Sequence, residues 1–125
     1  MAELDKCFQK EIWLVTFYPN IGSEIGKKRP AIIVSNDDVG KLQLVTVVPV
    51  TNWNERYKNY PWMVKIEPEE SNGLTKTSAI DCFQVKNLSK ERLVKRLGKV
   101  DESLLFMIHQ TIVKTFDYRY KLIKL

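Results

Sequence analysis

Hydrophobic and polar positions in the first part of the chain follow the short, turn-bounded pattern of β-strands. Residues 11–18, EIWLVTFY, are dominated by β-branched and aromatic side chains that alternate between two faces until Pro19 ends the run. Residues 31–35, AIIVS, are continuously apolar, which is typical of a strand covered on both faces. The same reasoning predicts strands at 42–50, 60–68, 77–85 and 92–100, with a turn or short 3₁₀ segment near residues 87–91.

The period changes at Asp101, after which apolar residues recur every four positions. Asp101 is suited to cap a helix, and Glu102 lies favourably in its first turn. The apolar stripe consists of Leu104, Ile108, Ile112 and Phe116. We therefore predict one α+β domain over residues 1–125, mainly β, in which five or six mostly antiparallel strands form a compact barrel closed by a C-terminal helix. Pro49 should mark an edge, a bulge or the end of its strand.

Charge and length narrow the class of protein. The 125-residue chain carries a formal net charge of +5 and a pI near 9.2, which favours an anionic partner without identifying it. No apolar run reaches the roughly 18 to 20 residues needed to cross a bilayer. The N-terminus lacks the basic flank and apolar core of a signal peptide, so we expect a cytoplasmic protein without membrane contact.

Cysteine and histidine are too sparse to build common catalytic or metal sites. Cys7 and Cys82 are far apart and form no Cys-x-x-Cys motif, so reduced thiols are expected, with Cys82 buried. His109 is the single histidine and lies beside the predicted helical stripe, which indicates packing rather than catalysis. We expect neither a metal site nor a cofactor.

Three motifs in a fixed order resemble a known family. EIWLVTFYPNIGSEIGKKRPAIIVSND is followed by VVPVT and then by SAIDCFQVKNLSKERLVKRLGKV, and together these segments resemble the MazF/PemK/Kid toxin endoribonucleases over about residues 9–118. The resemblance implies an SH3-like barrel of five to seven strands with a C-terminal helix, active as a homodimer. It also implies metal-independent cleavage of single-stranded RNA, leaving a 2′,3′-cyclic phosphate or 3′-phosphate and a 5′-hydroxyl, and inhibition by a cognate antitoxin.

The same resemblance assigns residues. The family's catalytic arginine and threonine correspond to Arg29 and Thr51, and Glu24 lies on the loop that borders the RNA groove in the family. Gln84 matches the family pattern in the fifth strand. Asp81 and Phe83 depart from it, because relatives place an arginine and an acid there.

The chemistry can also be argued from the residues themselves. Attack by a 2′-hydroxyl needs a group that takes its proton, a group that stabilises charge on the phosphate and a group that protonates the leaving 5′ oxygen. Arg29 suits the second task, because a guanidinium grips two phosphate oxygens, and Pro30 restrains its backbone. Arg29 is also a candidate for the third task, protonating the leaving oxygen. Thr51 offers a short hydroxyl to the phosphate. Glu24 and Asp81 both remain candidates for the base.

RNA binding should involve further side chains near this pair. Lys27 and Lys28 are placed to meet backbone phosphates, and Trp53 and Tyr57 are placed to stack unpaired bases. Lys95 and Lys99 share strand parity and would extend the basic surface. Each of these residues also has an ordinary structural alternative: solvated lysines, and aromatic rings used in packing or dimer contacts.

Two other functions are compatible with a small basic barrel. One is a non-catalytic RNA-binding protein, and the other is a gyrase poison of the CcdB type, although that type ends in Trp-Gly-Ile and this chain ends in KLIKL. For the nuclease, residues 22–30, GSEIGKKRP, are predicted to form a mobile rim that delivers Arg29 to the RNA.

Overall fold

The strands of this protein form one antiparallel sheet that curves around its own interior. The computed structural model describes residues 6–17, 21–23 and 27–116, without the side chains of 40–42. The strands run in the order β4-β5-β3-β2-β1-β7, and β6 also pairs with β3. Their bounds are β1 (Glu11–Thr16), β2 (Lys28–Ile33), β3 (Leu44–Asn52), β4 (Met63–Ile66), β5 (Ser78–Asp81), β6 (Lys86–Ser89) and β7 (Leu93–Lys99), followed by α1 (Glu102–Lys114). The predicted mainly-β fold with one C-terminal helix is confirmed.

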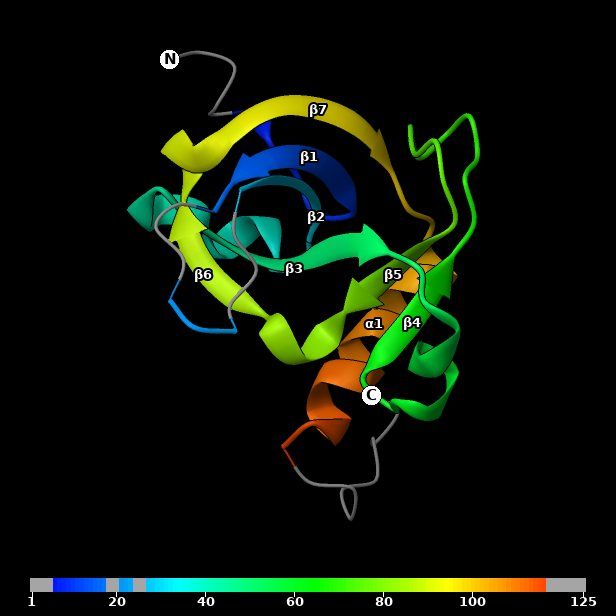
Figure 1. Ribbon diagram of the computed structural model, residues 1–125. Helices are drawn as coiled ribbons and strands as arrows, with labels where there is room; N and C mark the ends of the chain where they lie inside the picture. The colour runs from blue at the N-terminus through cyan, green and yellow to red at the C-terminus, as the bar shows by residue number, and fades with distance from the viewer. Residues whose placement is uncertain (1–5, 18–20, 24–26, 117–125) are drawn as a thin grey trace.

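Two hydrophobic clusters lie on opposite faces of the central strands. Ile32 of β2 belongs to the cluster that α1 covers with Leu105 and Ile108. Ala31 and Ile33 belong to the second cluster, inside the curve of the sheet. Figure 1 shows β1, β2, β3, β6 and β7 around that interior, while α1 lies behind β4 and β5. The continuous apolar run of β2 thus has the predicted cause, since both faces of the strand are covered.

Pro49 lies within β3 and not at the end of the strand, but one side of β3 is unpaired there. Residues 44–47 of β3 pair with β6, whereas residues 50–52 pair with β5. Pro49 lies between these two ladders, opposite Ala31 of β2, and is fully buried. A residue without an N–H group fits at this point, because the pairing of β3 with β6 has ended and its pairing with β5 has not yet begun.

The C-terminal helix begins as predicted. The Oδ1 atom of Asp101 accepts a hydrogen bond of 2.8 Å from the Leu104 amide, which caps α1. Ile108 is fully buried, and Leu104 and Ile112 pack against the same cluster. Phe116, the last residue of the predicted stripe, follows the helix and is 76% exposed. No helix in the described segments is long and apolar enough to cross a membrane.

The predicted strand at 77–85 is a shorter strand followed by a 3₁₀ turn. β5 ends at Asp81, η4 (Cys82–Gln84) follows, and β6 then begins. Asp81 causes the break because its side chain accepts a hydrogen bond from the Phe83 amide and caps η4. Asn36 and Asn54 cap η2 (Asp37–Leu42) and η3 (Glu55–Asn59) in the same way. A fourth 3₁₀ turn, η5 (Lys90–Arg92), lies between β6 and β7. The turn or 3₁₀ segment predicted near residues 87–91 is therefore confirmed only in its last part, because β6 extends to Ser89.

Candidate active site

Arg29 and Thr51 face each other across the ends of β2 and β3. The register of these strands pairs Ala31 with Pro49 and Ile33 with Val47. Two residues beyond the Ala31–Pro49 pair, the same register sets Arg29 opposite Thr51, so that their side chains project from the same face of the sheet. The guanidinium Nη1 of Arg29 donates to Oγ1 of Thr51 over 3.4 Å. The two side chains predicted from separate motifs therefore converge.

The pair opens into a basic hollow of about 230 Å³. Arg29 and Thr51 are both half-buried, which leaves them accessible to a ligand. Among the described residues that line the hollow, three are basic and none is acidic. The lining consists of Lys28, Arg29, Pro30, Val50, Thr51, Asn52, Leu74, Thr75, Lys76 and Ser78. Such a lining suits a phosphate group, because it offers cationic hydrogen-bond donors and hydroxyl groups and contains no competing carboxylate.

Lys76, which the sequence analysis missed, reaches the hollow through a tightly fixed loop. Asn72 in this loop is only 4% exposed, and its Oδ1 accepts from the amides of Glu69 and Leu74, each over 3.0 Å. Its Nδ2 donates to the carbonyl of Glu67 over 2.9 Å. Gly73 has φ +69°, and a Cβ there would lie 2.1 Å from the Leu97 carbonyl oxygen, so the loop packs against β7 through a position that only glycine fits.

Asp81 lies away from this hollow and is used structurally. It is 5% exposed, and its two carboxylate oxygens accept from the Phe83 amide and from Nε2 of Gln84, each over 3.2 Å. Burial raises the pKa of Asp81, although the hydrogen bonds from Phe83 and Gln84 oppose this effect. Gln84 itself lines a second hollow with Ser23, Phe83, Val85 and Lys86. Asp81 and Gln84 therefore lie together but apart from the lining around Arg29.

The remaining predicted residues divide between the site and its surroundings. Lys28 lines the hollow, and Lys27 is exposed beside it with φ +65° while its carbonyl accepts from the Phe17 amide. Lys95 and Lys99 are exposed on β7 and are not part of this lining. Glu24 lies outside the described residues, as do residues 25 and 26 of the predicted rim, so the role of Glu24 and the mobility of the rim stay predictions.

Trp53 follows Thr51 by two residues, which places both side chains on the same side of the extended chain. Its amide continues the pairing with β5 by donating to the Thr77 carbonyl. Its Nε1 donates to Glu55, and the Lys65 ammonium lies 5.0 Å from its ring centroid. Trp53 is thus held beside the hollow rather than buried in the core.

His109 and the cysteines behave as expected. His109 Nε2 lies 2.9 Å from the Val34 carbonyl oxygen, which holds the imidazole between α1 and the sheet. Cys7 and Cys82 are buried free thiols, and burial raises the pKa of Cys82 to about 12. Within residues 6–17, 21–23 and 27–116, no three His, Cys, Asp or Glu side chains gather closely enough to hold a metal ion.

The chain is similar to known proteins in sequence. A family model described as PemK-like, MazF-like toxin of type II toxin–antitoxin system matches residues 8–116. Endoribonuclease MazF9 of Mycobacterium tuberculosis is 32% identical over 113 residues, covering 86% of this chain and 93% of the relative. Endoribonuclease EndoA of Bacillus subtilis is 21% identical over 102 residues, covering 82% and 87%.

Solved structures agree in fold. MazF of Deinococcus radiodurans has a TM-score of 0.73 at 20% identity, covering 88% of this chain and 96% of that one. A mycobacterial endoribonuclease in complex with its cognate antitoxin has a TM-score of 0.71 at 16% identity, covering 92% and 99%. The family model spans nearly the whole chain, and the mycobacterial relative is matched over most of its length. This chain therefore belongs to the PemK-like, MazF-like toxins of type II toxin–antitoxin systems.

Proposed function

We propose that this toxin is an endoribonuclease that cleaves single-stranded RNA by attack of the RNA's own 2′-hydroxyl, without a metal ion, at the Arg29–Thr51 pair. The relatives named endoribonuclease support the activity. The observation that carries the choice of residues is the 3.4 Å contact between Arg29 and Thr51 in a basic, accessible hollow.

Arg29 and Thr51 divide the work on the phosphate. As the 2′ oxygen bonds to phosphorus and the bond to the 5′ oxygen breaks, negative charge grows on the two non-bridging oxygens, and the planar guanidinium of Arg29 binds them. Thr51 Oγ1 accepts from Arg29, so its own hydroxyl hydrogen is available to donate to a phosphate oxygen. Lys28 and Lys76 hold the neighbouring phosphates.

The 2′ proton needs an acceptor. Asp81 is buried and accepts two hydrogen bonds that fix η4, which makes it a poor candidate. Of the two acids that the sequence suggests, Glu24 is therefore the first to test. Glu24 takes one proton from the 2′ oxygen, and the Arg29 guanidinium delivers one to the leaving 5′ oxygen and then regains one from water, so atoms and charge balance over the step.

A cognate antitoxin and a second copy of the chain are the proposed protein partners. Family membership supports the antitoxin, and one solved relative is in complex with its own antitoxin. The homodimer is inferred from the family resemblance. In this scheme the antitoxin inhibits the toxin by covering the RNA-binding surface.

Cleavage of a defined single-stranded RNA in the presence of a chelator tests the proposal. The wild-type protein should cut and leave cyclic phosphate or 3′-phosphate ends. Arg29→Ala should cut at least roughly 10² times more slowly, the usual cost of a lost transition-state donor, while keeping its circular dichroism spectrum. A folded Arg29→Ala that cuts at the wild-type rate would falsify the assignment. Intact RNA with measurable binding by the wild-type protein would instead identify a non-catalytic RNA-binding protein.

A further inference from the structure

Five aromatic rings form a continuous row that begins beside the proposed cleavage site. We call Trp53, Tyr57, Tyr60, Trp62 and Phe83 the aromatic row. Successive ring centroids along it are separated by 5.9, 5.8, 4.9 and 5.9 Å. The row starts two residues after Thr51 and ends on η4, so it joins the basic hollow to a distant part of the surface.

Backbone hydrogen bonds hold the row in place. The Asn54 side chain caps η3, and the Tyr60 amide donates to the Tyr57 carbonyl over 2.9 Å. The Cys82 amide donates to the Trp62 carbonyl over 3.0 Å, which ties the start of β4 to η4. The rings are therefore presented by a fixed backbone, and little conformational entropy is lost when a ligand stacks on them.

None of the five rings is buried in the core. Four are half-buried, and Phe83 is 65% exposed, which is unusual for so large an apolar side chain. Cations accompany the rings: the Lys65 ammonium lies 5.0 Å from the Trp53 centroid, and the Arg56 guanidinium lies 5.8 Å from the Tyr57 centroid. Accessible rings interleaved with cations are the usual surface for single-stranded nucleic acid.

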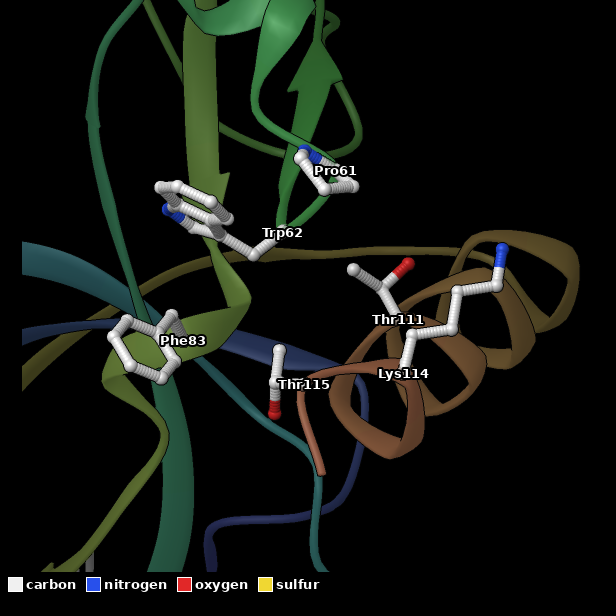
Figure 2. A pocket seen from close by; sticks show the side chains of 6 residues that line it. All are labelled: Pro61, Trp62, Phe83, Thr111, Lys114 and Thr115. Carbon is white, nitrogen blue, oxygen red and sulfur yellow. The ribbon is translucent and has the colours of Figure 1, made fainter. Parts of the chain in front are cut away.

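The row ends at a hollow of about 160 Å³ beside the last turn of α1. Pro61, Trp62 and Phe83 lie on one side of it, and Thr111 and Lys114 of α1 lie on the other with Thr115, which caps the helix (Figure 2). The aromatic wall offers a base a surface to stack on, and Lys114 offers its phosphate a cation.

The two hydroxyl groups also have a defined polarity. Thr111 Oγ1 donates to the Met107 carbonyl over 2.7 Å, and Thr115 Oγ1 donates to the Ile112 carbonyl over 2.6 Å. Each hydroxyl hydrogen is therefore used within the helix and its C-cap, so neither threonine has one left to donate to a ligand.

We propose that the aromatic row is a stacking track for unpaired RNA bases that flank the cleavage site, and that the hollow between Trp62, Phe83 and α1 receives one of these bases. The direction of the track, away from Arg29 and Thr51, rests on the proposed function. Binding along the track does not require cleavage. The cations beside the rings and the continuity with the basic hollow favour RNA over a protein partner as the occupant.

Binding of a 12-nucleotide single-stranded RNA tests the track. The RNA carries 2′-O-methyl groups, which block 2′ attack, and a terminal fluorophore for anisotropy. Trp62→Leu and Phe83→Leu keep an apolar side chain and remove the ring. Each should weaken Kd roughly 5- to 100-fold, the range for one stacked base. Phe106→Leu is the matched control, because Phe106 is an aromatic residue of α1 that is 59% exposed and outside the row. Its Kd should not change.

The other outcomes overturn the proposal. If Trp62→Leu and Phe83→Leu bound the RNA with the same Kd as Phe106→Leu and the wild-type protein, the rings would not stack bases. Loss of self-association in sedimentation, with unchanged RNA affinity, would assign the row to a protein interface instead. Phe83→Leu keeps the test decisive if Trp62→Leu does not fold, because Phe83 is exposed. Failure of the proposed function would be seen separately, as undiminished cleavage of unmodified RNA by Arg29→Ala.

Discussion

Asn72 fixes the loop that carries Lys76 to the basic hollow, and Asn72→Ala should therefore damage both stability and activity. The substitution removes three hydrogen bonds, from the amides of Glu69 and Leu74 and to the carbonyl of Glu67. Each bond contributes about 0.5 to 1.5 kcal/mol, so the expected loss is about 2 to 4 kcal/mol. That loss is a large part of the stability of an ordinary domain.

Neighbouring backbone makes relaxation of this loop difficult. A Cβ at Gly98 would lie 2.5 Å from both the Asn72 carbonyl carbon and the Ser71 carbonyl oxygen, so β7 leaves no space beside the loop. The Lys99 amide also donates to the Ser71 carbonyl over 3.0 Å. The groups orphaned in Asn72→Ala therefore cannot easily find new partners, and the cost should fall in the upper half of the range.

Urea unfolding followed by circular dichroism measures this effect. Asn59→Ala is the matched control, because Asn59 is exposed at the end of η3, and it should change the free energy of unfolding by less than about 0.5 kcal/mol. At a urea concentration where Asn72→Ala is folded, its RNA cleavage should still be slower than that of the control. If both alanine variants unfold at the same urea concentration, the structural role given to Asn72 is wrong.

Two further predictions concern buried titratable groups. Burial raises the pKa of Asp81, so the folded protein retains this proton to a higher pH than the unfolded chain does, and the free energy of unfolding should fall as the pH rises between the two pKa values. Asp81→Asn should flatten that slope in urea titrations from about pH 4 to about pH 7, and parallel wild-type and variant curves would contradict the argument. Cys82, whose pKa is raised to about 12, should resist iodoacetamide at neutral pH until the protein is unfolded in guanidinium chloride. Rapid labelling of Cys82 in the native protein, located by mass spectrometry, would refute its burial.

The sequence was sufficient for the pairing of Arg29 with Thr51. Both residues sit at strand ends inside the motifs that carry the family resemblance, and that resemblance assigned them to one site before their contact was seen. The helix was equally predictable, since Asp101 and the four-residue apolar spacing are local signals.

Other features depend on contacts that no local pattern encodes. Pro49 is allowed inside β3 because β3 exchanges β6 for β5 as its neighbour, and this exchange is visible only in the sheet topology. The aromatic row joins the 53–62 segment to Phe83, and a hydrogen bond between distant backbone groups brings them together. Asp81 was predicted to lie within a strand. An aspartate side chain can accept a hydrogen bond from the backbone amide two residues later and so end a strand, and this local signal could have been used.

The central claim is that Arg29 and Thr51 act on one phosphate, and a double-mutant cycle of single-turnover cleavage tests it most directly. The rates to compare are those of the wild-type protein, Arg29→Ala, Thr51→Val and the double variant, on one single-stranded RNA. Because the two side chains are in contact and bind the same group, the account predicts strong non-additivity, with the double variant only slightly slower than Arg29→Ala. Rate losses that simply multiply, in variants that all fold, would mean that the two residues act independently and would contradict the account.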